Sequence, residues 1–138
     1  MKKLVSIVLA LFLLNSCSVD QDEQPNYTVS VLPIESVIMP TVSTTLPAPT
    51  TYPIIIKYKN PNSCTRYNGF YYKKDLLNRT VGIEVFSENG RTCTVDNTLV
   101  EKTLNFEPIA AGTYIFKFYT GEDANGVNQY IIQNIVVP

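Results

Sequence analysis

Alternation of large apolar residues with a period of two recurs along the chain and constrains its fold more than any other feature. The pattern is clearest over residues 54–58, 81–85 and 114–118, where every second residue is a large apolar one. Successive side chains of a β-strand point to opposite faces, so this period predicts strands with one buried face. No convincing helical period accompanies it. Together with many Val, Ile, Thr and Tyr residues, the pattern predicts an all-β protein.

Turn signals separate these runs. Asn125-Gly126 between two β-patterned runs predicts a hairpin, and Glu88-Asn89-Gly90 and Asn60-Pro61-Asn62 predict further turns. Residues 40–53 contain four prolines and five threonines. Because proline cannot donate to a β-ladder, we expect a loop or an irregular edge there.

Seven or eight short strands, with turns every 8 to 15 residues, predict an antiparallel β-sandwich over residues 27–138. Gly112-Thr113-Tyr114, at the start of a late strand, resembles the penultimate strand of immunoglobulin-like domains. We therefore expect an Ig-like β-sandwich, with a small open barrel as the alternative.

The N-terminus has the pattern of an export signal. Lys2 and Lys3 precede an apolar run from Leu4 to Leu14, which is too short to span a bilayer as a helix. Because Leu14-Asn15-Ser16 ends at Cys17, residues 1–16 resemble a bacterial lipoprotein signal peptide, although Asn15 is not the commonest residue at its position. This resemblance implies that Cys17 is lipidated and anchors the mature chain to a membrane. The alternative is an ordinary secretory signal with an incidental cysteine.

Residues 17–26 are polar and acidic, which is typical of a flexible tether. An acidic stretch directly after the lipidated cysteine also resembles the surface-export signal of Bacteroidota lipoproteins. We expect an outer-membrane protein displayed at the cell surface, with a periplasm-facing anchor as the alternative.

The predicted domain carries no net charge. The chain has 11 basic and 12 acidic residues; without those of the signal and tether, nine of each remain. A nucleic-acid partner is not expected, because binding to phosphates requires a basic face. The chain also has no histidine for general base catalysis. We expect neither an enzyme nor a cofactor.

The three cysteines of the chain have two different expected roles. Lipidation of Cys17 leaves Cys64 and Cys93, which lie 29 positions apart beside turn residues. An exported protein is in a compartment where disulfides persist, so we expect these two cysteines to be bridged. A metal site is not expected, because it would need two more soft ligands and the chain has no histidine or further thiol.

The segment from Arg66 to Lys74 holds four aromatic residues and three cations. In a regular strand, Tyr67, Tyr71 and Lys73 share the outward face, whereas Phe70 and Tyr72 point to the core. An aromatic face among cations suits contacts with glycans or proteins. These three residues are our candidate binding surface; the alternative is a solvent face rich in tyrosine.

Residues 121–128 combine two carboxylates with two side-chain amides, which faintly resembles a calcium loop. The closing glutamate of an EF-hand is missing, so an Asn-Gly hairpin with acidic flanks is the favoured interpretation.

Several motifs together resemble a family of small uncharacterised lipoproteins from Bacteroidota, chiefly flavobacteria. They are Asn60-Pro61-Asn62-Ser63-Cys64, Gly69-Phe70-Tyr71-Tyr72, Arg79-Thr80-Val81, Cys93-Thr94 and the run from Gly112 to Phe118. The resemblance covers roughly residues 29–137. It implies a β-sandwich in the cell envelope and supplies no known activity or ligand.

The sequence leaves three functional hypotheses. The first is a lipid-anchored module that binds a glycan or protein partner. The second is a structural or accessory subunit of an outer-membrane assembly. The third is an Ig-like protease inhibitor that inserts loops into a protease cleft.

Overall fold

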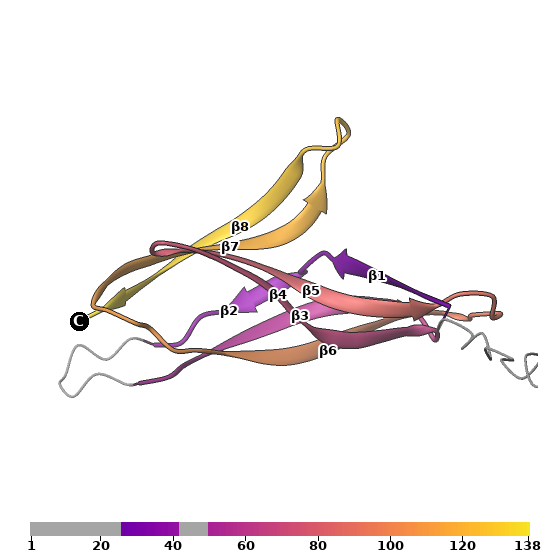
Figure 1. Ribbon diagram of the computed structural model, residues 1–138, viewed down its shortest axis with the longest axis horizontal. Coiled ribbons are helices and arrows are strands. Elements are labelled where there is room, and N and C mark those ends of the chain that lie inside the picture. The colour runs from indigo at the N-terminus through magenta and orange to yellow at the C-terminus, as the bar shows by residue number, and fades with distance from the viewer. Residues whose placement is uncertain (1–25, 42–49) are drawn as a thin grey trace, which may run out of the picture.

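The computed structural model describes residues 26–41 and 50–138, which form eight β-strands in two sheets (Figure 1). The strands are β1 (Tyr27–Leu32), β2 (Ser36–Ile38), β3 (Tyr52–Asn62), β4 (Thr65–Asp75), β5 (Asn78–Glu88), β6 (Val95–Phe106), β7 (Gly112–Glu122) and β8 (Asn128–Val137). The predicted all-β sandwich is confirmed. The predicted signal peptide, Cys17 and almost all of the tether lie outside the described residues.

The larger sheet is built around β5. Strand β4 pairs along nearly the whole of β5, so β1 and β7 must share the opposite edge. There, β1 pairs with residues 83–88 of β5, and β7 pairs with residues 78–81. Strand β8 pairs with β7, and these two form a hairpin that projects away from the other strands (Figure 1). The smaller sheet has the order β2-β3-β6.

One strand pair departs from the predicted antiparallel arrangement. Strands β5 and β7 run parallel over four residue pairs, whereas the other pairs in the described part of the chain are antiparallel. Two purely antiparallel Ig-type sheets contain no such pair. The sandwich is therefore established, and its strand pairing differs at this point from the Ig-like order that we expected.

The two sheets enclose a core built from the alternating residues of β3, β5 and β7. Its fully buried members are Ile54, Ile56, Val81, Ile83, Val85, Tyr114, Phe116 and Phe118. Phe106 of β6 is also buried and meets the rings of Tyr114 and Phe116 edge-on at 4.8 and 5.0 Å between centroids. Edge-to-face pairs add about 0.5–1.5 kcal/mol each beyond the burial of area. The period-two pattern therefore identified the core correctly.

The start of β7 is fixed by the Tyr114 hydroxyl. This group accepts hydrogen bonds from the backbone N–H groups of Ile109 and Ala110 and donates one to the carbonyl of Ala110. A tyrosine near the start of a late strand that bonds the preceding backbone resembles the tyrosine corner of Ig-like sandwiches. The same side chain thus packs in the core and holds the β6–β7 connection.

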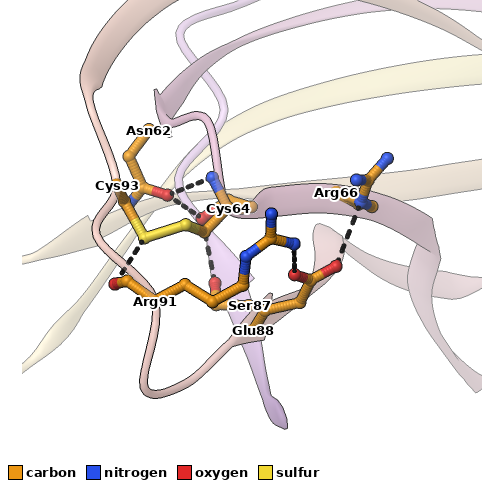
Figure 2. Close-up of polar contacts among 8 residues, drawn as sticks. Asn62, Cys64, Arg66, Ser87, Glu88, Arg91 and Cys93 are labelled. Carbon is orange, nitrogen blue, oxygen red and sulfur yellow. Dashed lines mark hydrogen bonds and ion pairs between the residues drawn. A yellow bond between two sulfur atoms is a disulfide. The ribbon is translucent and has the colours of Figure 1, made fainter.

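Cys64 and Cys93 form the predicted disulfide, with their Cα atoms 5.5 Å apart (Figure 2). The bridge joins the β3–β4 turn to the β5–β6 loop, and both connections cross from one sheet to the other. Neighbouring hydrogen bonds join the same two connections: Thr94 N–H donates to Ser63 Oγ, and Ser63 N–H donates to the Thr94 carbonyl. The disulfide therefore ties two inter-sheet crossings at one end of the sandwich.

Two predicted loops have different limits in the structure. Asn60-Pro61-Asn62 is an irregular end of β3, where the pairing with β6 shifts, and the turn follows at Ser63-Cys64. There, Asn62 Oδ1 accepts hydrogen bonds from Cys64 N–H and the Thr65 hydroxyl (Figure 2). In the predicted loop over 40–53, residues 42–49 lie outside the described part, and Tyr52 and Pro53 already belong to β3.

No helix in the described part has the length and hydrophobicity needed to cross a membrane.

Candidate functional site

A β-bulge in β4 divides the predicted binding surface. Tyr67 pairs with Val85 and Gly69 pairs with Glu84, so Asn68 is an extra residue on β4. Because a bulge shifts the alternation by one position, Tyr67 faces the same way as Phe70 and Tyr72. The prediction that Tyr67 shares the outward face of Tyr71 and Lys73 is therefore wrong.

Tyr67 instead lies half-buried against the core. Its ring is 5.7 Å from that of Phe70 and 6.4 Å from that of Tyr58, and the Lys102 ammonium lies 4.6 Å from its centroid. Burial, followed by the neighbouring Tyr58, raises the pKa of Tyr67. These contacts give Tyr67 a structural role.

Tyr71 and Lys73 do lie on the outward face of the larger sheet, and strand register shows what surrounds them. Tyr71 pairs with Gly82, and Lys73 pairs with Thr80, both on β5. The outer face is defined here by the outward residues of its five strands. They include Tyr27, Val29 and Val31 of β1, Tyr71 and Lys73 of β4, Thr80, Gly82, Glu84 and Phe86 of β5, Ile115, Lys117 and Tyr119 of β7, and Tyr130 and Ile132 of β8.

The apolar stripe of β1 points outward, away from the core. Tyr27, Val29 and Val31 are 50%, 53% and 37% exposed. They face outward because they pair with Glu88, Phe86 and Glu84, which alternate with the buried residues of β5. Contiguous apolar residues on a solvent-exposed face are typical of interaction sites.

Gly82 lies beneath Val31 at the centre of the outer face, where β1 and β7 both pair with β5. A Cβ atom at this position would lie 2.5 Å from Val31 Cγ1, 3.7 Å from Tyr71 Cβ and 3.8 Å from Tyr119 Cβ. A glycine inside a strand often marks a place where other groups approach closely. Its missing side chain lets Val31 lie over the strand between the two tyrosines.

A hollow of about 340 Å³ opens at this point. It is lined by Val31, Tyr71, Lys73, Thr80, Tyr119, Asn128 and Tyr130. Tyr119 and Tyr130 come from the projecting β7–β8 hairpin and meet at 6.2 Å between ring centroids in an edge arrangement. Burial, then Glu122 and Tyr130, raise the pKa of the Tyr119 hydroxyl. We call this site the tyrosine hollow.

A second hollow of about 290 Å³ lies on the same outer face and is lined by Tyr27, Val29, Asn68 and Phe86. The rings of Tyr27 and Phe86 are 6.1 Å apart and meet edge-on. Asn68, the bulged residue, donates from Nδ2 to Glu84 Oε1 at 2.6 Å. The outward residues of β1 connect this hollow with the tyrosine hollow, so the outer face offers two neighbouring recesses.

The tyrosine hollow combines aromatic rings with polar groups that suit recognition of a neutral or weakly acidic ligand. Tyrosine rings provide a large contact area at small entropic cost, and their hydroxyls can form hydrogen bonds. The Lys73 ammonium, the Asn128 amide and the Thr80 hydroxyl add directional polar groups. A few polar groups in an aromatic recess are a general feature of small-ligand sites.

The acidic hairpin tip uses its carboxylate for the turn itself. Asp123 Oδ1 accepts hydrogen bonds from the backbone N–H groups of Asn125 and Val127, and Asp123 Oδ2 accepts one from Gln129 Nε2. Within the ranges 26–41 and 50–138, no three His, Cys, Asp or Glu side chains gather in a group that could hold a metal ion. The favoured hairpin interpretation of residues 121–128 agrees with this geometry.

Comparison of the chain with protein-family models, curated proteins and solved structures finds no match.

The sequence interpretation missed Tyr119, Tyr130 and Val31 as members of the site. Tyr119 lies out of phase with the core residues Phe116 and Phe118, so it could have been recognised as an outward aromatic residue. Its proximity to Tyr71 depends on the pairing of β5 with β7, which are separate in the sequence. Only the fold brings these residues together.

Proposed function

We propose that the protein is a cell-envelope lipoprotein whose β-sandwich binds glycans through the tyrosine hollow. The single observation that carries the proposal is that three tyrosine side chains, Tyr71, Tyr119 and Tyr130, line one hollow on a solvent-exposed face. The flat apolar face of a sugar ring can stack on an aromatic ring while its hydroxyls bond to nearby polar groups. Tyr71 and Tyr130 remain 41% and 37% exposed, so their rings are accessible to such a ligand.

The lipoprotein part of the proposal depends on the sequence before the domain. The basic start, the short apolar run and Cys17 support lipid anchoring, and the acidic residues after Cys17 support display at the cell surface. Protease treatment of intact cells tests this placement, with a periplasmic protein as the leakage control. Loss of the domain with an intact control supports surface display; protection until the outer membrane is broken supports a periplasm-facing anchor.

Affinity electrophoresis of the full-length chain through gels containing soluble glucans, mannans, xylans or pectins tests glycan binding. We expect at least one polysaccharide to retard the wild-type chain and Lys73→Ala to reduce the retardation. Lys59→Ala is the matched control, because Lys59 lies on the smaller sheet, paired with Glu35 at 3.3 Å. Unchanged migration of the wild-type chain in every gel would contradict the proposal.

An accessory-subunit function is a second candidate, favoured by the aliphatic residues that flank the hollow. Val29 and Ile132 are 53% and 60% exposed on the outer face, and a protein partner would cover them. Stoichiometric co-purification with one membrane protein, lost in a Val29→Ser/Ile132→Ser variant, would support this candidate. Retention of polysaccharide by the same variant would favour glycan binding.

A further inference from the structure

Arg79 is a buried cation at the start of β5, on the opposite face of the sheet from the tyrosine hollow. The residue is 2% exposed, and its guanidinium carbon lies 4.9 Å from the ring centroid of Tyr114 and 5.9 Å from that of Phe106. Nη1 donates to the backbone carbonyls of Leu76 and Asn78, both at 2.7 Å. The side chain is therefore held in one orientation by two carbonyls and two rings.

The positive charge of Arg79 has no carboxylate partner in the part of the chain that the structure describes. None of the ion pairs there includes Arg79, and its buried Nε atom has no hydrogen-bond partner. Burial of an unpaired charge is unfavourable, and cation–π contacts offset only part of that cost. The rings and carbonyls leave the Nε–H of the guanidinium without a partner and its charge without a carboxylate.

A hollow of about 500 Å³ lies beside this cation. Tyr72 and Lys74 of β4 line one side of it, and Leu104, Pro108 and Ile109 contribute apolar surface. Its size falls within the range of about 300–1,000 Å³ that is usual for small-molecule sites. Glu107 also lines the hollow but forms no ion pair with Arg79.

We propose that this hollow binds the carboxylate group of a small organic acid, with Arg79 as its main partner and Lys74 as a second cation. A carboxylate is planar and offers two acceptor oxygens, which match the donors of a guanidinium group. Because Nη1 is occupied by carbonyls, the unpartnered Nε–H is a donor that such a ligand would satisfy. The site is independent of the tyrosine hollow, since Tyr72 and Lys74 alternate along β4 with Tyr71 and Lys73.

Titration of the full-length chain with sodium D-glucuronate, followed by NMR of the arginine Nε–H groups, tests the proposal. The chain has three arginines, so the Arg79 signal can be assigned with Arg66→Lys and Arg91→Lys variants. We expect glucuronate to shift the Arg79 signal in a saturable way, whereas glucose and sodium chloride at equal ionic strength do not. A parallel titration with N-acetylglycine shows whether an acidic sugar or an amino-acid carboxylate fits better.

Substitutions of two exposed residues, Lys74 and Glu107, distinguish ligand binding from a purely structural role of Arg79. Lys74→Gln should weaken the affinity and Glu107→Gln should strengthen it, each by about two- to fivefold, since single exposed charges contribute about 0.2–1 kcal/mol. Lys59→Gln, on the smaller sheet, should leave it unchanged. An Arg79 signal that neither acid moves, or affinities that do not respond to the charges at 74 and 107, would overturn the proposal and leave Arg79 as a structural residue.

Discussion

Val31 lies directly over Gly82, so that a Cβ atom on Gly82 would come within 2.5 Å of Val31 Cγ1. This contact joins β1 to the centre of β5 and places Val31 in the lining of the tyrosine hollow. The site therefore depends on an absent side chain as much as on the tyrosines that surround it.

Gly82→Ala should destabilise the domain by about 1–3 kcal/mol, because an added methyl group in a tightly packed place forces its neighbours to move. Urea unfolding of the variant measures this effect. In a Gly82→Ala/Val31→Ala double variant, the Cγ1 atom that the new methyl group would meet is absent, so the loss from Gly82→Ala should be smaller than in the wild-type background. If the double variant lost as much stability as the two single variants together, the contact with Val31 would not be the cause of the loss in Gly82→Ala.

Tyr114→Phe should cost about 1–3 kcal/mol, because the three partly buried hydrogen bonds of its hydroxyl with the backbone of Ile109 and Ala110 are lost. Tyr52→Phe is the matched control: the Tyr52 hydroxyl is buried and has no partner among the described residues. Its removal should be neutral or stabilising. Thermal unfolding compares the two variants. Equal losses of stability would contradict the role of the Tyr114 hydroxyl in holding the β6–β7 connection.

A Cys64→Ser/Cys93→Ser variant should unfold with about 3–4 kcal/mol less stability, as the chain-entropy account of a cross-link of this span predicts. Urea unfolding measures the difference. Alkylation of the native, non-reduced protein should leave both cysteines unmodified, and reduction should expose both thiols. Modification of either one before reduction would contradict the bridge.

Stability should fall in alkaline solution. Burial raises the pKa values of Tyr58, Tyr67 and Tyr72 above the ordinary 10.0, although the Arg79 charge partly offsets this effect at Tyr72. The unfolded chain releases these protons first, so the stability that the buried tyrosines contribute is complete below pH 10.0 and is lost as the pH rises through the raised values. Unfolding midpoints measured across this range should fall less steeply for Tyr67→Phe than for the wild type. Identical slopes would show that Tyr67 has no part in this loss.

The sequence was sufficient to predict the strands and the core, because period two identifies alternate buried residues wherever a strand is regular. It was insufficient at Asn68, where one inserted residue turns Tyr67 inward. Gly69 within the same run was a usable signal, since glycine inside a strand often marks a bulge. Alternation also could not show that the apolar stripe of β1 faces outward, because that depends on its register with β5.

The composition of the tyrosine hollow was only half predictable. Tyr71 and Lys73 could be placed on an outward face from local alternation alone. Tyr119 and Tyr130 reach them through the parallel contact between β5 and β7, whose paired residues are more than 35 positions apart in the chain. Local patterns contain no information about such a pairing.

The binding of polysaccharide by a Tyr71→Ala/Tyr119→Ala variant tests the central claim most directly. Its migration should be compared with that of the wild type and of Leu99→Ala, an exposed apolar residue on the smaller sheet. The account predicts that the double variant keeps its folded state, as shown by a cooperative unfolding transition, and loses retardation in every gel that retards the wild type. Retardation of a folded double variant equal to that of the wild type would contradict the claim that the tyrosine hollow is the binding site.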